Sequence, residues 1–182
     1  MIVPEYEILR SILSRRHTTI ASLGAKVQTG KVVWNQVKSS LTDEESDDTI
    51  PLVYDHNIRN ENTLDLSAVT KNKEKRRYVN KTAVSAEPTT TSSIVVRRGY
   101  GNTFKFRYAM APPGIFGENH VNVITSPDAD VLSKIYTSLG DEDTLRFGKI
   151  MFGNGSVSKT ELESVIPIFT DGEEPVPGTL DT

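Results

Sequence analysis

A block of interleaved basic and aromatic residues is the part of this sequence best suited to binding a charged ligand. Residues 71–107 contain ten Lys or Arg and two acidic residues, a net charge of +8, although the whole chain carries −3. Phosphate attraction depends on the local field, so this block favours nucleic-acid binding. A solvated basic face that balances the acidic segments 41–70 and 108–182 is the alternative interpretation. The interleaved aromatic residues are Tyr78, Tyr100, Phe104 and Phe106.

Catalytic motifs are missing from the sequence. The glycine pair in GYGN (99–102) is not followed by a helical pattern, and GNGS (153–156) lacks a preceding strand and a P-loop lysine. There is no Cys, and the His residues at positions 17, 56 and 120 are scattered. We therefore predict no catalytic, cofactor-binding or metal-binding residues in this chain.

Composition indicates one domain of ordinary size. The chain has 182 residues, of which 36% are hydrophobic, and its mean hydropathy is −0.36. It contains no apolar run near the roughly 20 residues that a membrane helix needs. The N-terminal residues do not have the pattern of a signal peptide. We expect a soluble cytoplasmic protein without a membrane partner.

Periodicity predicts an α+β fold: one domain with a twisted mixed β-sheet of short strands, flanked by three or four helices. We expect helices over 4–15, 34–41, 131–139 and 158–166, the third preceded by Ser126 as its cap. Residues 71–81 fit either a helix or an exposed strand. The expected strands are 25–29, 50–54, 94–96, 104–110 and 120–125.

Three blocks of sequence occur in a recognisable order. The first block runs through Lys26-Val27-Gln28-Thr29-Gly30 and Val33-Trp34-Asn35-Gln36 to Pro51-Leu52-Val53-Tyr54 and Asn57-Ile58. The second block is Arg97-Arg98-Gly99-Tyr100-Gly101-Asn102 with Glu118-Asn119-His120-Val121-Asn122. The third block is Gly153-Asn154-Gly155-Ser156 with Ser158–Leu162 and Ile166-Pro167. Together they resemble the C-terminal target-recognition domain of N6-adenine-specific DNA methyltransferases from bacterial restriction–modification systems.

The resemblance implies a division of the chain and two partners. Residues 1–19 would be an N-terminal helix or linker from an upstream catalytic domain, 20–168 the target-recognition domain, and 169–182 an acidic flexible tail. The Asn-Pro-Pro-aromatic motif of these enzymes is missing, since Ala111 and Gly114 flank Pro112-Pro113. Methyl transfer and S-adenosylmethionine binding would therefore belong to a catalytic domain in the same or a separate chain, and the second partner is double-stranded DNA.

The resemblance also suggests which side chains contact DNA. Arginine pairs with guanine and asparagine with adenine, whereas lysine and arginine also bind phosphates. Arg97, Arg98, Asn102 and Asn35 are the candidates for base reading. The candidates for phosphate contact are Lys31, Lys71, Lys73, Lys75, Arg76, Arg77, Lys105 and Arg107. Two other functions remain open: a protein-docking or structural domain of a restriction–modification complex, and a metal-dependent nuclease that uses the scattered acids.

Overall fold

The computed structural model describes residues 4–99, 105–152 and 155–170. In this part of the chain the α-helices are α1 (Pro4–Ser14), α2 (Ala129–Leu139), α3 (Glu142–Met151) and α4 (Lys159–Ser164). The strands are β1 (His17–Thr18), β2 (Lys26–Thr29), β3 (Leu41–Thr42), β4 (Thr49–Val53), β5 (Tyr78–Asn80), β6 (Ser93–Arg97), β7 (Tyr108–Ala111), β8 (Phe116–Gly117), β9 (Val121–Thr125) and β10 (Ile168–Phe169).

The strands form three sheets. The largest has the order β2-β9-β6-β7 and is antiparallel throughout. A second sheet has the order β3-β5-β4-β8, in which β4 and β8 run parallel. The short strands β1 and β10 pair with each other. The prediction of an α+β domain with short strands and three or four helices is confirmed, with the strands shared among several sheets.

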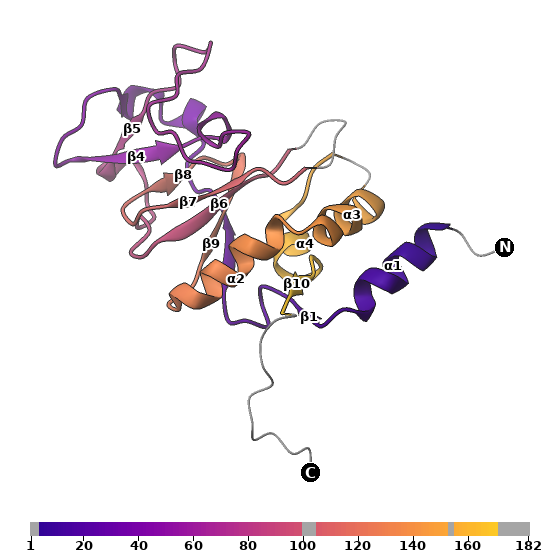
Figure 1. Ribbon diagram of the computed structural model, residues 1–182. Helices are drawn as coiled ribbons and strands as arrows, with labels where there is room; N and C mark the ends of the chain where they lie inside the picture. Colours follow the sequence, from indigo (N-terminus) through magenta and orange to yellow (C-terminus); the bar gives the residue numbers. More distant parts are fainter. Residues whose placement is uncertain (1–3, 100–104, 153–154, 171–182) are drawn as a thin grey trace.

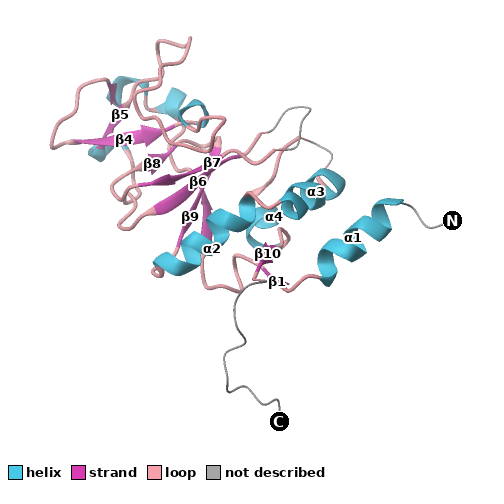
Figure 2. Ribbon diagram, viewed as in Figure 1, coloured by secondary structure: helices cyan, strands magenta, loops and turns pink. Residues whose placement is uncertain are grey.

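The β2-β9-β6-β7 sheet is covered on both faces. Because successive strand residues point to opposite faces, Ile94 and Ile124 pack among the helices while Val95 and Val123 face the other way. That second face meets Val53 at the end of β4. Figures 1 and 2 show the result: the helices lie on one side of the large sheet, and β4, β5 and β8 lie on the other.

One helix begins where its sequence signal indicates, and the cap of another lies two residues later than expected. The Ser158 hydroxyl accepts a hydrogen bond from the Glu161 amide, and the Glu161 carboxylate accepts one from the Ser158 amide. This capping box opens α4. The cap of α2 is Asp128 and not Ser126, because Asp128 has the extended backbone that precedes the helix. The Ser126 hydroxyl instead accepts from the Asp128 amide.

Three elements differ from the sequence expectation. Residues 34–41 form two 3₁₀ turns, η1 (Trp34–Gln36) and η2 (Lys38–Ser40), before β3, because Trp34 and Val37 pack against the second sheet and not along one helical face. The strand expected over 104–110 begins only at Tyr108. Helix α3 was not anticipated; its cap is Asp141, which Arg15 of the distant N-terminal segment also contacts at 2.9 Å.

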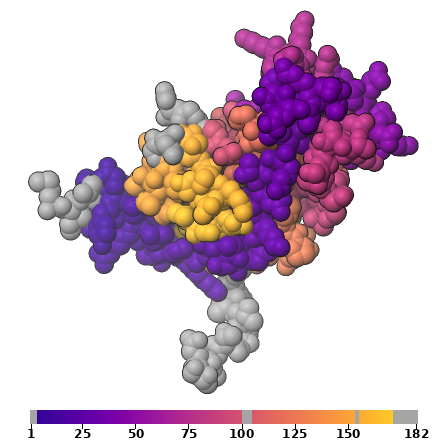
Figure 3. All heavy atoms as spheres, turned by 180° about the vertical axis from the view of Figure 1, so that it is seen from behind, coloured from indigo at the N-terminus to yellow at the C-terminus, as the bar shows by residue number. Residues whose placement is uncertain are grey.

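Residues 4–19 contribute to the fold. Ile12 of α1 is buried in the main core, α1 contacts α3, and His17 pairs with Phe169. Residues 171–182 of the acidic segment 169–182 lie outside the described residues. Seen from behind in Figure 3, the purple and magenta segments form one end of the molecule, whereas the orange and yellow segments lie toward the other. The part of the predicted basic block over 71–81 belongs to the first of these ends, whereas Gly99 pairs with Ser156.

Candidate nucleic-acid interface

A tight turn after β4 organises the candidate site. Residues Asp55–Asn57 form one 3₁₀ turn, η3, directly after Tyr54. The Asn57 side chain is buried; its Oδ1 accepts from the Tyr54 amide at 2.8 Å and its Nδ2 donates to the Asp65 carbonyl at 2.8 Å. Both ends of an amide side chain are therefore satisfied by backbone groups, which fixes the turn in one conformation. Cavities open on both sides of it.

The first cavity is a basic pocket of about 190 Å³ beside Tyr54 and His56. The irregular segment 68–77 closes this pocket. The sequence allowed either a helix or a strand over the basic stretch 71–81; the structure has a loop there that leads into β5. The cationic side chains around it are Lys73, Lys75, Arg76 and Arg77.

Aromatic rings hold this basic loop in place. The Lys75 ammonium lies 5.0 Å from the centre of the Tyr54 ring and 5.7 Å from that of Trp34. Lys38 also lies over Trp34, at 5.1 Å, and its Nζ is 2.9 Å from a carboxylate oxygen of Glu74. These cation–π contacts place Trp34 as an anchor for the loop.

Asp43 is the acidic anchor of the same pocket. Its carboxylate accepts from the Arg76 guanidinium at 2.6 Å and from the Arg77 amide at 3.1 Å. The hydrogen bond from Arg76 is the main cause that lowers the pKa of Asp43 below its ordinary value, against a smaller opposing effect of burial. Arg76 and Arg77 are consequently committed to Asp43, whereas Lys73 has no ion pair with any described residue.

The second cavity contains Arg97. It measures about 580 Å³ and lies on the other side of His56, next to the segment 58–65. The Arg97 Nη2 is 3.4 Å from Asp55 Oδ2, a long contact that leaves most of the guanidinium donors for other acceptors. Within this cavity Arg59 pairs with Asp65 at 2.6 Å.

His56 lines both cavities and stacks on the Tyr54 ring, with 5.2 Å between ring centres. Burial lowers the pKa of His56 below 6.5; Asp55 opposes the shift and Lys75 adds to it. The ring is therefore neutral at pH 7, so it offers one donor and one acceptor without adding charge.

The remaining predicted residues fall into two sets. Arg98 is half-buried and donates to the Asn119 carbonyl at 2.9 Å, and Arg107 donates to the Asn60 carbonyl, so both brace backbone near the Arg97 cavity. Lys71, Lys105, Asn35 and Lys31 are exposed, and Lys31 lies on a separate pocket beside β2. Asn102 lies outside the described residues.

Sequence reasoning missed the central turn of this surface. His56 and Arg59 were not among the candidate residues, and Asn57 was noted only in the resemblance. The signal was present in the run Tyr54–Asn57, where an aromatic residue, an acid and a histidine follow a buried strand. His120, named in the second block of the resemblance, has Nδ1 2.9 Å from the fully buried Glu118 carboxylate.

The described residues do not contain a cluster suited to a metal ion. No three His, Cys, Asp or Glu side chains among them are arranged to hold one. The described helices are all too short or too polar to cross a bilayer. Gly99 follows the antiparallel strand β6, and residues 100–102 of GYGN lie outside the described residues.

Comparison of the sequence with models of protein families and with curated proteins gives no match.

Proposed function

We propose that this chain is the DNA sequence-recognition module of an N6-adenine DNA methyltransferase of a restriction–modification system. It would act in the cytoplasm, bind duplex DNA and position the target adenine for methyl transfer by a catalytic domain that these 182 residues do not contain. The observation that carries the proposal is the position of His56, which joins the basic pocket to the cavity that contains Arg97. Lysine side chains that can bind phosphates and an arginine guanidinium that can bind base edges therefore lie on one surface.

Lysines supply the phosphate contacts in this proposal. Lys71 and Lys73 project from the exposed loop, and neither has an ion pair with a described residue. A lysine ammonium is a compact point charge, so it attracts any nearby phosphate without demanding one geometry. These residues would set affinity and its dependence on salt, and they would not distinguish sequences.

Arg97 supplies the base contact. It ends β6, so the sheet fixes its backbone, and Asp55 orients its guanidinium through one long contact. A guanidinium held in this way presents two parallel donors, which match the acceptors O6 and N7 of guanine in the major groove. Because Arg98 is tied to the Asn119 carbonyl, Arg97 is the better reader of the two.

A docking role has one specific observation in its favour. Helix α1 exposes Tyr6 and Leu13, which are seven residues apart and therefore share one helix face, and Tyr6 is 59% exposed. Exposed apolar side chains on one helix face are typical of a surface that another protein covers. In the alternative proposal, the chain is a protein-docking domain of a restriction–modification complex. The two proposals are compatible if α1 contacts the catalytic domain while the basic surface contacts DNA.

Equilibrium binding to DNA tests the proposal. Fluorescence anisotropy with a random duplex of about 30 bp should show binding that weakens steeply as salt rises. Sites selected from a random pool should then bind more tightly, and Arg97→Ala should lose roughly 1–3 kcal/mol of discrimination at one base pair while keeping the salt dependence. Lys149→Gln on α3 is the matched control, since Lys149 is exposed on the helical side. Absence of binding at low salt would refute DNA recognition and favour docking.

A further inference from the structure

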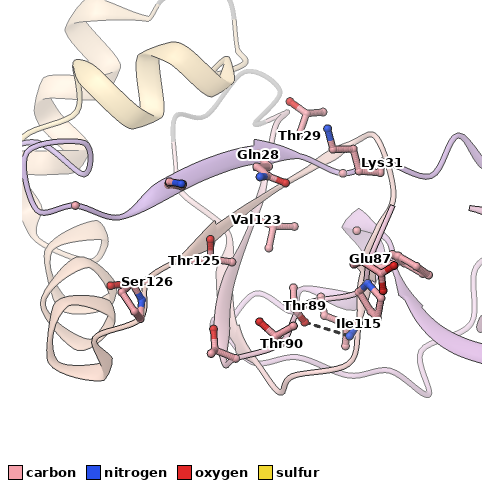
Figure 4. A pocket seen from close by; sticks show the side chains of 18 residues that line it. Gln28, Thr29, Lys31, Glu87, Thr89, Thr90, Ile115, Val123, Thr125 and Ser126 are labelled. Atoms are coloured by element: carbon pink, nitrogen blue, oxygen red, sulfur yellow. Dashed lines mark hydrogen bonds between the residues drawn. The ribbon is translucent and has the colours of Figure 1, made fainter. Parts of the chain in front are cut away.

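A third cavity is distinct from the basic surface. It has a volume of about 480 Å³ and lies at the β2 edge of the large sheet, on the face that carries Gln28 and Val123. Figure 4 shows Gln28 and Lys31 along one side, Thr89 and Thr90 on the opposite side, and Val123 between them. This volume is within the range of small-molecule sites, roughly 300–1,000 Å³.

The wall opposite β2 is preformed. The Thr89 amide donates to the Ile115 carbonyl at 3.0 Å, the Ile115 amide donates to the Thr89 hydroxyl at 3.2 Å, and the Gly114 amide donates to the Thr89 carbonyl at 2.6 Å. Three hydrogen bonds at one residue hold the threonine-rich loop 87–91 against the chain that enters β8. A ligand would therefore meet an ordered wall and lose little free energy in ordering it.

Uncommitted polar groups gather on the β2 side. Lys26 and Gln28 are exposed on the same face of β2, two residues apart, and Lys31 follows the strand. None of the three has a hydrogen bond or an ion pair from its side chain to a described residue, and Glu87 is the only acidic residue that lines the cavity in the described part of the chain. The lining therefore carries an excess of one positive charge and a free amide.

The inner surface is apolar. Val123 pairs across the sheet with Gln28, so the Gln28 side chain leaves the sheet beside the small exposed part of Val123. Lys26 pairs across the sheet with Thr125, so both side chains lie on this face. An apolar floor, one amide and two ammonium groups together match a ligand with a planar ring, a hydrogen-bonding edge and an anionic end.

We propose that this cavity binds one nucleotide, with its phosphate near Lys31 and its base against Val123 and within reach of the Gln28 amide. The nucleotide can come from two sources: a free nucleoside monophosphate, or a nucleotide turned out of a DNA duplex. The second source rests on the proposed DNA function; the first does not. An amide side chain that can both donate and accept suits adenine, whose edge presents one donor and one acceptor.

Nuclear magnetic resonance tests the site directly. Titration of the ¹⁵N-labelled full chain with 5′-dAMP should shift the Gln28 side-chain amide and the backbone amides of 28–31 and 88–91, with a Kd of about 1 mM or tighter. Inorganic phosphate should bind roughly tenfold more weakly, because it lacks the contacts of the base. Shifts confined to the His56 and Arg97 surface, or equal affinities for phosphate and 5′-dAMP, would overturn the proposal.

Matched variants separate the contacts. Gln28→Glu replaces the amide that reaches the base with a carboxylate, which cannot donate to the acceptor on the adenine edge, and should weaken 5′-dAMP binding roughly tenfold. Gln28 is exposed, so the thermal midpoint of unfolding should not change. Lys149→Gln should leave nucleotide binding unaltered. Unchanged affinity in Gln28→Glu would refute the role of the cavity.

Duplex DNA distinguishes the two sources. A duplex with 2-aminopurine opposite a mismatched base fluoresces more strongly when that base leaves the stack. If the nucleotide comes from DNA, wild-type protein should raise this fluorescence and Gln28→Glu should not, while anisotropy reports equal duplex binding by both. Binding of 5′-dAMP without a fluorescence change assigns the site to a free nucleotide. Loss of duplex binding with normal 5′-dAMP binding would refute only the DNA function.

Discussion

Neutralising Lys71 and Lys73 together should change the salt dependence of DNA binding by a calculable amount. The variant Lys71→Gln, Lys73→Gln removes two exposed ammonium groups that have no ion pair with a described residue. Each neutralised phosphate contributes about 0.9 to the slope of log K against log salt, so the slope should become shallower by about 1.8. Over a fourfold rise in salt, the wild type should lose about tenfold more affinity than the variant.

The assay is fluorescence anisotropy with one labelled duplex at salt concentrations from about 50 to 200 mM. The free energy of unfolding of the variant should stay within about 0.5 kcal/mol of the wild type, because neither lysine contributes packing or pairing in the folded state. Lys149→Gln should leave the slope unaltered. Parallel slopes for the wild type and the double variant would refute phosphate contact by this loop, even if both proteins bind DNA.

Three further predictions concern the framework of the site. Gly30→Ala should cost about 3 kcal/mol in urea unfolding, because a Cβ there would overlap the Glu118 carbonyl oxygen; a variant of wild-type stability would disprove this close approach. Asn57→Ala should cost about 1–3 kcal/mol, because it leaves the Tyr54 amide without its partner, and DNA affinity should fall with it. Hydrogen bonds from Ser67 and Arg59 lower the pKa of Asp65 to about 2 from 3.8. The stabilising contribution of Asp65 should therefore be complete above about pH 4 and disappear as the pH falls toward 2. If the urea midpoint of Asp65→Asn falls over this pH range as much as that of the wild type, this assignment is wrong.

The elements that the sequence predicted correctly have local causes. Residues of β6 and β9 alternate between the two hydrophobic cores because a strand has a two-residue period, and the Ser158 capping box requires only its own turn. Residues 34–41 have helical spacing, yet Trp34 packs on a sheet formed by segments far along the chain. That contact is non-local, so no window of sequence contains it.

The candidate site was only partly predictable for the same reason. Basic residues within 71–107 are evident from composition, but their partners lie in the acidic segment 41–70: Asp43 holds Arg76, and Asp55 contacts Arg97. Arg97 and Arg98 are adjacent, and the structure sends one to Asp55 and the other to Asn119, as strand alternation suggests. The position of the neighbouring turn decides which of the two arginines enters a cavity, and that position cannot be predicted from the sequence.

The acidic partners change what the basic block can do. Arg76 and Arg77 are held by Asp43, so a phosphate would have to displace a carboxylate before it could use them. The uncommitted lysines have no such competitor. On this surface the arginines therefore fix the shape of the loop, and the lysines provide the field that a polyanion meets first. If the surface binds DNA as proposed, Asp43→Asn should alter the position of the loop more than the charge it presents. Its main effect should be on sequence discrimination, with little change in the salt slope.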